Sequence, residues 1–148
     1  MAATWAPGTP GVLVLPSGRT VRGTVLDLSG SRAEQPDFAL HLAAEEPAPR
    51  DWPTRWVHWR DFRTPSDPED AREALREAWE RSTRQRVEVA CRGGRGRTGT
   101  ALACLAVIDG VPPSTAVEFV RRGFHPRAVE TPRQKRFVRR FGKPPTSG

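Results

Sequence analysis

The chain has 148 residues, a formal net charge of +7 and 28% charged residues. This length suits one core, so we expect a single domain over residues 1–148 with loose ends at 1–10 and 142–148. The N-terminus lacks a basic-then-apolar leader, and no apolar run approaches the roughly 20 residues that span a bilayer. These features argue against a membrane span and favour a cytoplasmic protein. Only two of the 24 basic residues are lysines, which is typical of a GC-rich bacterial genome.

Four segments in the first half have the pattern of β-strands. Val12–Leu15 and Arg19–Leu26 flank a Pro-Ser-Gly turn and predict an N-terminal hairpin. Phe38–Leu42 is a third candidate strand. Arg55–Trp59 follows a Pro-rich connection and is expected at the edge or end of the sheet.

The first predicted helix has a start signal and an apolar stripe. Ser66-Asp-Pro-Glu69 has the pattern of a capping box with proline in the first turn. Four apolar residues then recur at helical spacing through about Arg81, namely Ala71, Ala74, Leu75 and Ala78.

The second half of the chain predicts one strand and three helices. Val87–Ala90 is a strand, and the wholly apolar segment 101–108 belongs to a buried helix that begins near Arg97 or Thr98. Further helices are expected over Ser114–Arg122, ended by Gly123, and over Thr131–Phe141. This order of elements indicates an α/β fold with a short twisted sheet flanked by helices.

The segment after the 87–90 strand has the composition of an anion-binding loop. Backbone N–H groups from Arg92 to Arg97 can converge on one tetrahedral anion, because three intervening glycines permit a curled backbone. Arg97 adds a bidentate guanidinium, and the following helix directs its positive end to the same point. The predicted phosphate-binding residues are Arg92, Gly93, Gly94, Arg95, Gly96 and Arg97.

Cys91 opens this loop, so a nucleophile and an anion site coincide. Helix N-termini and nearby cations favour the thiolate form of cysteine. Cys104, by contrast, falls inside the apolar helix and is expected to be an inert core residue. With two cysteines, neither a disulfide framework nor a Cys91–Cys104 bridge is expected.

The loop resembles that of the cysteine-dependent tyrosine and dual-specificity phosphatases, which have a cysteine, five residues, an arginine, and serine or threonine. Cys91, Arg97 and Thr98 match these positions. The resemblance implies a protein tyrosine phosphatase-like fold for a compact, bacterial-type member. It also implies that Cys91 is the nucleophile, that Arg97 binds phosphate, and that Thr98 steadies the departing thiolate, although Thr98 could also cap the helix.

Two further segments resemble motifs of the same family. Trp59-Arg-Asp-Phe-Arg-Thr-Pro65 is similar to the loop that carries the general acid, which falls on Asp61. Asp67 and Asp70 could compete for that role but are better explained as first-turn helix charges. Downstream, Gln134 takes the position of a glutamine that orients the attacking water. Thr131 and Gln134 also form a capping-box pattern, so a purely structural glutamine remains an alternative.

The chain departs from the family pattern at two positions. Ala90 stands where most members have a histidine that orients the loop, and Arg60 replaces the proline of the acid loop. The first departure leaves open a catalytically weak phosphate-binding module. A rhodanese-like sulfurtransferase is a less suitable alternative, because it has no need of Asp61 or the Arg-Thr-Gly ending.

The expected reaction is hydrolysis of a phosphate monoester through a cysteinyl-phosphate, without a cofactor or metal. Phosphotyrosine in proteins is the favoured substrate, with small phosphomonoesters also possible and inorganic phosphate or vanadate as ligands. The basic loop also resembles tensin-type lipid phosphatases, so inositol-type phosphates are the alternative, unless Arg92 and Arg95 pair with Asp27 or Glu88. The basic C-terminal helix could contact nucleic acid, but a solvated face with Phe137, Val138 and Phe141 packed inward explains it better, so no nucleic-acid partner is expected. The three histidines have no ligand-like spacing.

Overall fold

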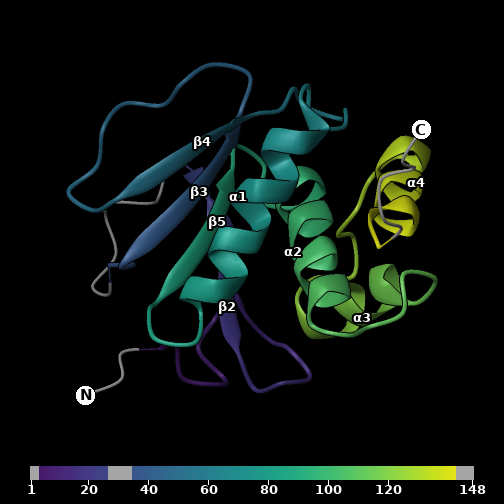
Figure 1. Cartoon of the computed structure of the whole chain (residues 1–148), viewed down its shortest axis with the longest axis horizontal. Helices are drawn as coiled ribbons and strands as arrows, with labels where there is room; N and C mark the ends of the chain where they lie inside the picture. The colour runs from purple at the N-terminus through teal and green to yellow at the C-terminus, as the bar shows by residue number, and fades with distance from the viewer. Residues whose placement is uncertain (1–3, 27–34, 143–148) are drawn as a thin grey trace.

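The computed structural model describes residues 4–26 and 35–142, over which the chain forms five strands and four helices. In Figure 1 the strands occupy the left of the molecule, α2, α3 and α4 lie on the right, and α1 crosses in front of β5. Helices α1 and α2 contact the sheet directly, whereas α4 packs against α2. The described residues thus form the α/β fold that the sequence predicts.

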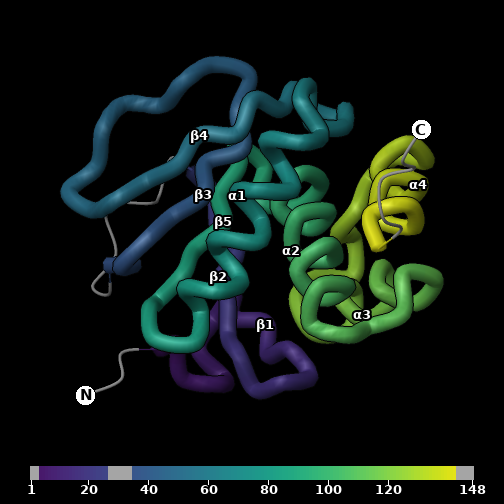
Figure 2. Tube along the Cα trace, in the orientation of Figure 1, coloured from purple at the N-terminus to yellow at the C-terminus, as the bar shows by residue number. Residues whose placement is uncertain are grey.

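The sheet is mixed and has the order β1-β2-β5-β3-β4. Strands β1 and β2 pair antiparallel, and every other neighbouring pair is parallel. The N-terminal hairpin is therefore confirmed, and it lies beside α3 (Figure 2). The strands are Val12–Val14 (β1), Thr20–Val25 (β2), Phe38–Ala43 (β3), Thr54–His58 (β4) and Val87–Cys91 (β5).

The parallel pairing aligns the carboxyl ends of four strands. Val25 lies opposite Cys91 across β2 and β5, and Ala43 lies opposite His58 across β3 and β4. In parallel sheets, ligands bind beyond this edge, where the connecting loops meet. Strand β4, which leads into the predicted acid loop, lies at one edge of the sheet, as expected.

Helix α1 spans Pro68–Arg81, and the predicted stripe of four apolar residues is buried. The N-cap is Asp67, whose side chain accepts hydrogen bonds from the backbone N–H groups of Glu69 and Asp70. The capping box predicted at Ser66 is therefore wrong by one residue. The hydroxyl of Ser66 is instead hydrogen-bonded to the side chain of His58, the last residue of β4. This contact forms because the chain turns back toward the end of β4 before α1 begins.

Helix α2 spans Gly96–Ile108 and is the central helix, buried from Gly96 through Ala106. Cys104 is fully buried there, burial raises its pKa, and both cysteines are free thiols. The remaining helices are Ala116–Gly123 (α3), which begins two residues later than predicted, and Pro132–Phe141 (α4).

The N-terminal segment contacts the sheet through Trp5. The Trp5 side chain is buried, and its indole N–H donates to the backbone carbonyl of Val87 at 2.8 Å. The guanidinium of Arg22 lies 3.8 Å from the centre of the Trp5 ring and forms a buried ion pair with Glu88 at 2.6 Å. This arrangement ties Trp5 to β2 and β5, whereas residues 1–3 and 143–148 lie outside the described residues.

Candidate active site

Strand β5 places Cys91 at the carboxyl edge of the sheet. The Cys91 side chain is buried, and its sulfur accepts a hydrogen bond from the backbone N–H of Gly94 at 3.1 Å. The loop therefore curls back over the predicted nucleophile.

The loop backbone leaves several donors available to an anion. Gly94 has φ +68°, a conformation that glycine adopts at no steric cost. Helix α2 begins without a side-chain cap. Within the described part of the chain, the N–H groups of Gly93, Arg95 and Gly96 have no acceptor, so they can bind a tetrahedral anion at the helix N-terminus.

Arg97 connects this loop to the one that follows β4. Its side chain is only 5% exposed, and its Nη1 donates to the Trp59 carbonyl at 3.0 Å. Its Nε lies 3.7 Å from Oδ1 of Asp61. The structure therefore brings the predicted phosphate-binding arginine and the predicted acid together, although 36 residues separate them in the chain.

Asp61 lies on an exposed turn that its neighbours hold in place. Its carboxylate accepts from the backbone N–H of Phe62, which has φ +62°, a conformation uncommon for a bulky residue. The buried Trp59 closes the turn by donating from its indole to the Arg63 carbonyl at 2.7 Å. Asp61 itself is 57% exposed, so a bound substrate can reach it.

The two competing acids have other roles. Asp67 caps α1, and Asp70 is ion-paired with Arg55 at 3.0 Å. This pairing agrees with the interpretation of both as charges of the first helical turn.

Gln134 is fully buried, and its amide is already hydrogen-bonded. Its Oε1 accepts from the backbone N–H groups of Glu130 and Thr131, at 2.9 and 3.2 Å. Its Nε2 donates to the Arg63 carbonyl at 3.1 Å. The capping-box alternative is thus present in the structure, and the same side chain also supports the acid loop through Arg63.

The remaining loop residues differ in exposure. Thr98 is buried, its hydroxyl has no hydrogen-bond partner among the described residues, and it does not cap α2. Arg92 and Arg95 are exposed. Of the two acids that could have paired with them, Glu88 is paired with Arg22, and Asp27 lies outside the described residues.

Ala90 has two buried polar neighbours in the sheet. Thr24 lies opposite it on β2 and His41 lies opposite it on β3. Thr24 Oγ1 and His41 Nε2 are buried without a hydrogen-bond partner in the described structure. Burial, and to a lesser extent the charge of Arg50, lowers the pKa of His41 to about 4. A neutral imidazole therefore lies beside the position where the family usually has histidine.

A cavity of about 470 Å³ opens beside the loop, and Asp61, Arg92 and Arg97 line it. Its other lining residues follow β2 and β3 or lie at their ends: Leu26, Leu42, Ala43, Ala44, Glu45, Glu46 and Pro47. All four parallel strands therefore contribute to one site. Sequence reasoning missed the residues from β2 and β3, because they have no motif.

Sequence reasoning also missed the segment that supports the start of α2. A Cβ added to Gly96 would collide with Oε1 of Glu130, so that carboxylate packs against the loop. The preceding residue, Val129, has φ +66°. Arg121 holds this strained turn by donating to the carbonyls of Ala128 and Val129, both at 2.8 Å. The contact of Glu130 with Gly96 had no sequence signal.

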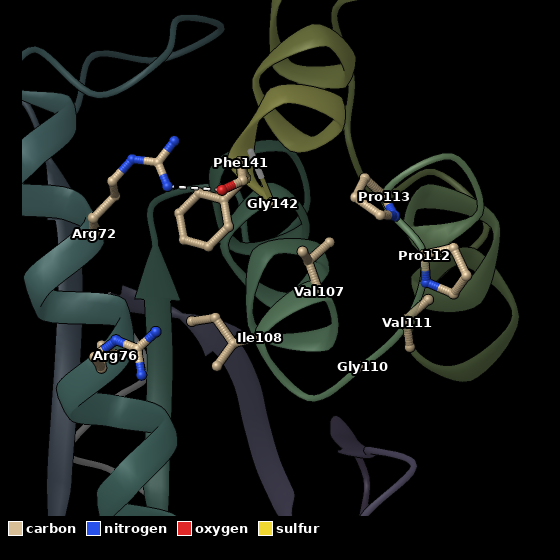
Figure 3. A pocket seen from close by; sticks show the side chains of 10 residues that line it. All are labelled: Arg72, Arg76, Val107, Ile108, Gly110, Val111, Pro112, Pro113, Phe141 and Gly142. Atoms are coloured by element: carbon tan, nitrogen blue, oxygen red, sulfur yellow. Dashed lines mark hydrogen bonds between the residues drawn. The ribbon is translucent and has the colours of Figure 1, made fainter. Parts of the chain in front are cut away.

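A second cavity, of about 550 Å³, contains no residue of the phosphate loop (Figure 3). Arg72 and Arg76 face an apolar wall that includes Val107 and Ile108. Arg72 is already occupied, because it donates to the Phe141 carbonyl at 2.7 Å and lies 4.6 Å from the Phe141 ring centre. This cavity has no nucleophile or acid among its lining residues.

Two further properties of the chain concern metal ligands and membrane-spanning helices. Over the described residues, no three His, Cys, Asp or Glu side chains gather as they would around a metal ion. No helix within the described residues is both long and apolar enough to cross a bilayer.

Comparison with known proteins identifies the class. Residues 38–141 match the family described as "Swiss Army Knife protein, DSP-PTPase phosphatase domain" (PTP-SAK). The matched region holds Asp61, the Cys91–Thr98 loop and Gln134. The chain therefore belongs to this family, within the cysteine-dependent tyrosine and dual-specificity phosphatases, and the resemblance inferred from the loop is confirmed.

Individual relatives agree with this assignment. The crystal structure of Tk-PTP in the active form is 26% identical, with a TM-score of 0.73 over 91% of this chain and 98% of that one. Kinase associated phosphatase, with its catalytic cysteine replaced by serine, has the same fold at 16% identity, with a TM-score of 0.71 over 90% of this chain and 95% of that one. An uncharacterised protein of Methanocaldococcus jannaschii, MJECL20, is 44% identical over 62 residues. That match covers 42% of this chain and 41% of the relative.

Proposed function

We propose that this chain hydrolyses phosphate monoesters, chiefly phosphotyrosine in proteins, through a cysteinyl-phosphate intermediate. One observation supports this most directly. Arg97 ends the loop that begins at Cys91, and its guanidinium lies 3.7 Å from the Asp61 carboxylate. Nucleophile, anion-binding group and acid thus belong to one connected site.

In the first step, the Cys91 thiolate attacks phosphorus opposite the ester oxygen. The S–P bond forms as the P–O bond to the leaving group breaks, and Asp61 donates its proton to that oxygen. Arg97 and the loop N–H groups stabilise the negative charge on the other three oxygens.

In the second step, water attacks phosphorus and the S–P bond breaks. The Asp61 carboxylate accepts the proton of that water, so Asp61 returns to its acid form and Cys91 to the thiolate. We propose that Thr98 steadies the departing sulfur. Gln134 would have to leave its capping hydrogen bonds to orient the water, so we assign it to support of the acid loop through Arg63.

Inositol-type phosphates are the second candidate substrate class. The observation that favours them is that Arg92 is exposed and lines the cavity beside Arg97. A second phosphate could bind this additional cation.

The experiment is the initial rate of para-nitrophenyl phosphate hydrolysis from about pH 5 to 8 with a chelator present. We expect Cys91→Ser to abolish turnover but retain vanadate or phosphate binding. Asp61→Asn should slow turnover about 10²–10⁴-fold and remove the basic limb of the pH profile. Cys104→Ala and Asp51→Asn are matched controls, because neither side chain lies in the site.

Two outcomes would contradict the proposed function. Retained turnover in Cys91→Ser would reject Cys91 as the nucleophile. A folded, reduced parent that binds vanadate but hydrolyses nothing would identify a phosphate-binding module, and Ala90→His would be the variant to make next.

A further inference from the structure

The cavity beside the phosphate loop is built from both charged and apolar groups. Its apolar part consists of Leu26 at the end of β2 together with the end of β3 and the turn that follows it: Leu42, Ala43, Ala44 and Pro47. Its cations are Arg92 and Arg97. An apolar stem that carries a phosphate could therefore lie along this surface while the phosphate binds to the loop.

Besides the predicted general acid Asp61, two further carboxylates line the cavity. Glu45 and Glu46 follow β3, both are exposed, and both line the cavity. Across the described residues, neither is ion-paired or hydrogen-bonded through its side chain. Two negative charges are thus available to whatever lies next to the bound phosphate.

The position of these carboxylates follows from the sheet. Strands β3 and β5 are parallel neighbours, so the turn after Ala43 lies on the same edge as the loop after Cys91. The carboxylates therefore belong to the entrance of the site rather than to a remote surface.

We propose that Glu45 and Glu46 select phosphomonoesters that carry a cationic group beside the phosphate, namely phosphopeptides with Lys or Arg next to the phosphorylated residue. This inference rests on the proposed function. Arg97 and the loop N–H groups take up the first phosphate, so the next group of the substrate meets the carboxylates. A cationic side chain gains an ion pair there, whereas a second phosphate or an acidic side chain is repelled.

The expected effect is moderate, because these carboxylates are exposed to solvent and salt. Two exposed ion pairs correspond to a preference of about two- to tenfold, which falls as ionic strength rises. This preference opposes the attraction of Arg92 for inositol polyphosphates, so it decides between the two candidate substrate classes.

The experiment compares kcat/KM for three phosphotyrosine peptides of equal length with arginine, alanine or glutamate on both sides of the phosphotyrosine. Inositol 1,4,5-trisphosphate and para-nitrophenyl phosphate complete the set. The parent should prefer the arginine peptide over the glutamate peptide at about 50 mM salt, and lose much of this preference at about 500 mM. The Glu45→Gln/Glu46→Gln variant should reduce the preference at least twofold and hydrolyse the trisphosphate faster than the parent.

The control is Glu80→Gln/Glu118→Gln, which changes the net charge equally at exposed residues outside the cavity. It should retain the parental preference. Para-nitrophenyl phosphate has no flanking charge, so its kcat/KM in each protein is the reference to which the peptide values are normalised, and the control variant should hydrolyse it like the parent.

The outcomes separate the two proposals. If para-nitrophenyl phosphate is hydrolysed but the peptide preference is the same in the parent and in Glu45→Gln/Glu46→Gln, the selectivity proposal is wrong and the phosphatase proposal stands. A preference for the glutamate peptide or the trisphosphate would also overturn it. If the folded parent hydrolyses none of these substrates, both proposals fail.

Discussion

The guanidinium of Arg97 donates a 3.0 Å hydrogen bond to the backbone carbonyl of Trp59. This bond joins the end of the phosphate loop to the start of the turn that carries Asp61. Trp59 is buried, so the position of its carbonyl is fixed by the core rather than by solvent. We therefore infer that phosphate binding and placement of the acid depend on the same arginine.

We predict that Arg97→Lys lowers kcat/KM for para-nitrophenyl phosphate by about 10²–10³-fold. Lysine retains the charge, but it cannot bind the carbonyl of Trp59 and two phosphate oxygens with one planar group. Initial rates and vanadate inhibition measure the loss. Arg84→Lys, at an exposed arginine outside the cavity, is the control, and near-parental activity of Arg97→Lys would contradict the assignment.

Three glycines near the loop should respond differently to alanine. A Cβ at Gly99 would lie 2.9 Å from the backbone N of Val129, whereas one at Gly96 meets the flexible end of Glu130, and one at Gly93 meets nothing within 4 Å. We expect Gly99→Ala to cost about 1–3 kcal/mol through overpacking, offset in part by about 1 kcal/mol of helix propensity. Urea unfolding should rank Gly99→Ala as least stable and Gly93→Ala near the parent. The reverse order would show that these contacts do not limit stability.

Gln134→Ala should lower the free energy of unfolding by about 1–3 kcal/mol. The substitution removes the acceptor for two backbone N–H groups and the donor to Arg63. Thermal or urea unfolding measures this loss. Lys135→Ala, one residue along α4, is the comparison. Unchanged stability with a build-up of cysteinyl-phosphate would instead support the water-orienting role.

Stability should fall in mild acid because of His41. Its pKa is lowered to about 4 in the folded chain, from about 6.5 when unfolded, so the unfolded state binds a proton first. This contribution is fully present above about pH 6.5 and is lost as pH falls toward 4, by at most about 3 kcal/mol. Urea unfolding at pH 7.5 and 4.5 should show a smaller loss in His41→Gln than in the parent. His125→Gln, at a less buried histidine, should lose as much as the parent, and equal losses in all three would reject His41 as the cause.

Features that depend only on neighbours in the chain could be predicted from the sequence. The loop from Cys91 to Thr98 could be predicted because its glycines, its arginine and the helix start are contiguous, and backbone geometry follows from local residues. The hairpin and the apolar stripe of α1 were predictable for the same reason. The capping box at Thr131 also needed only four consecutive residues.

Which distant segments meet depends on the packing of the whole fold. The contacts of Arg97 with Trp59, Gln134 with Arg63 and Trp5 with Val87 depend on the order of the strands and on how α4 packs, which no local pattern encodes. The turn that carries Glu45 has no motif, and it reaches the site because parallel strands align their carboxyl ends at one edge. The predicted nucleophile and anion loop can therefore be recognised in the sequence alone, whereas the walls of the site result from long-range packing.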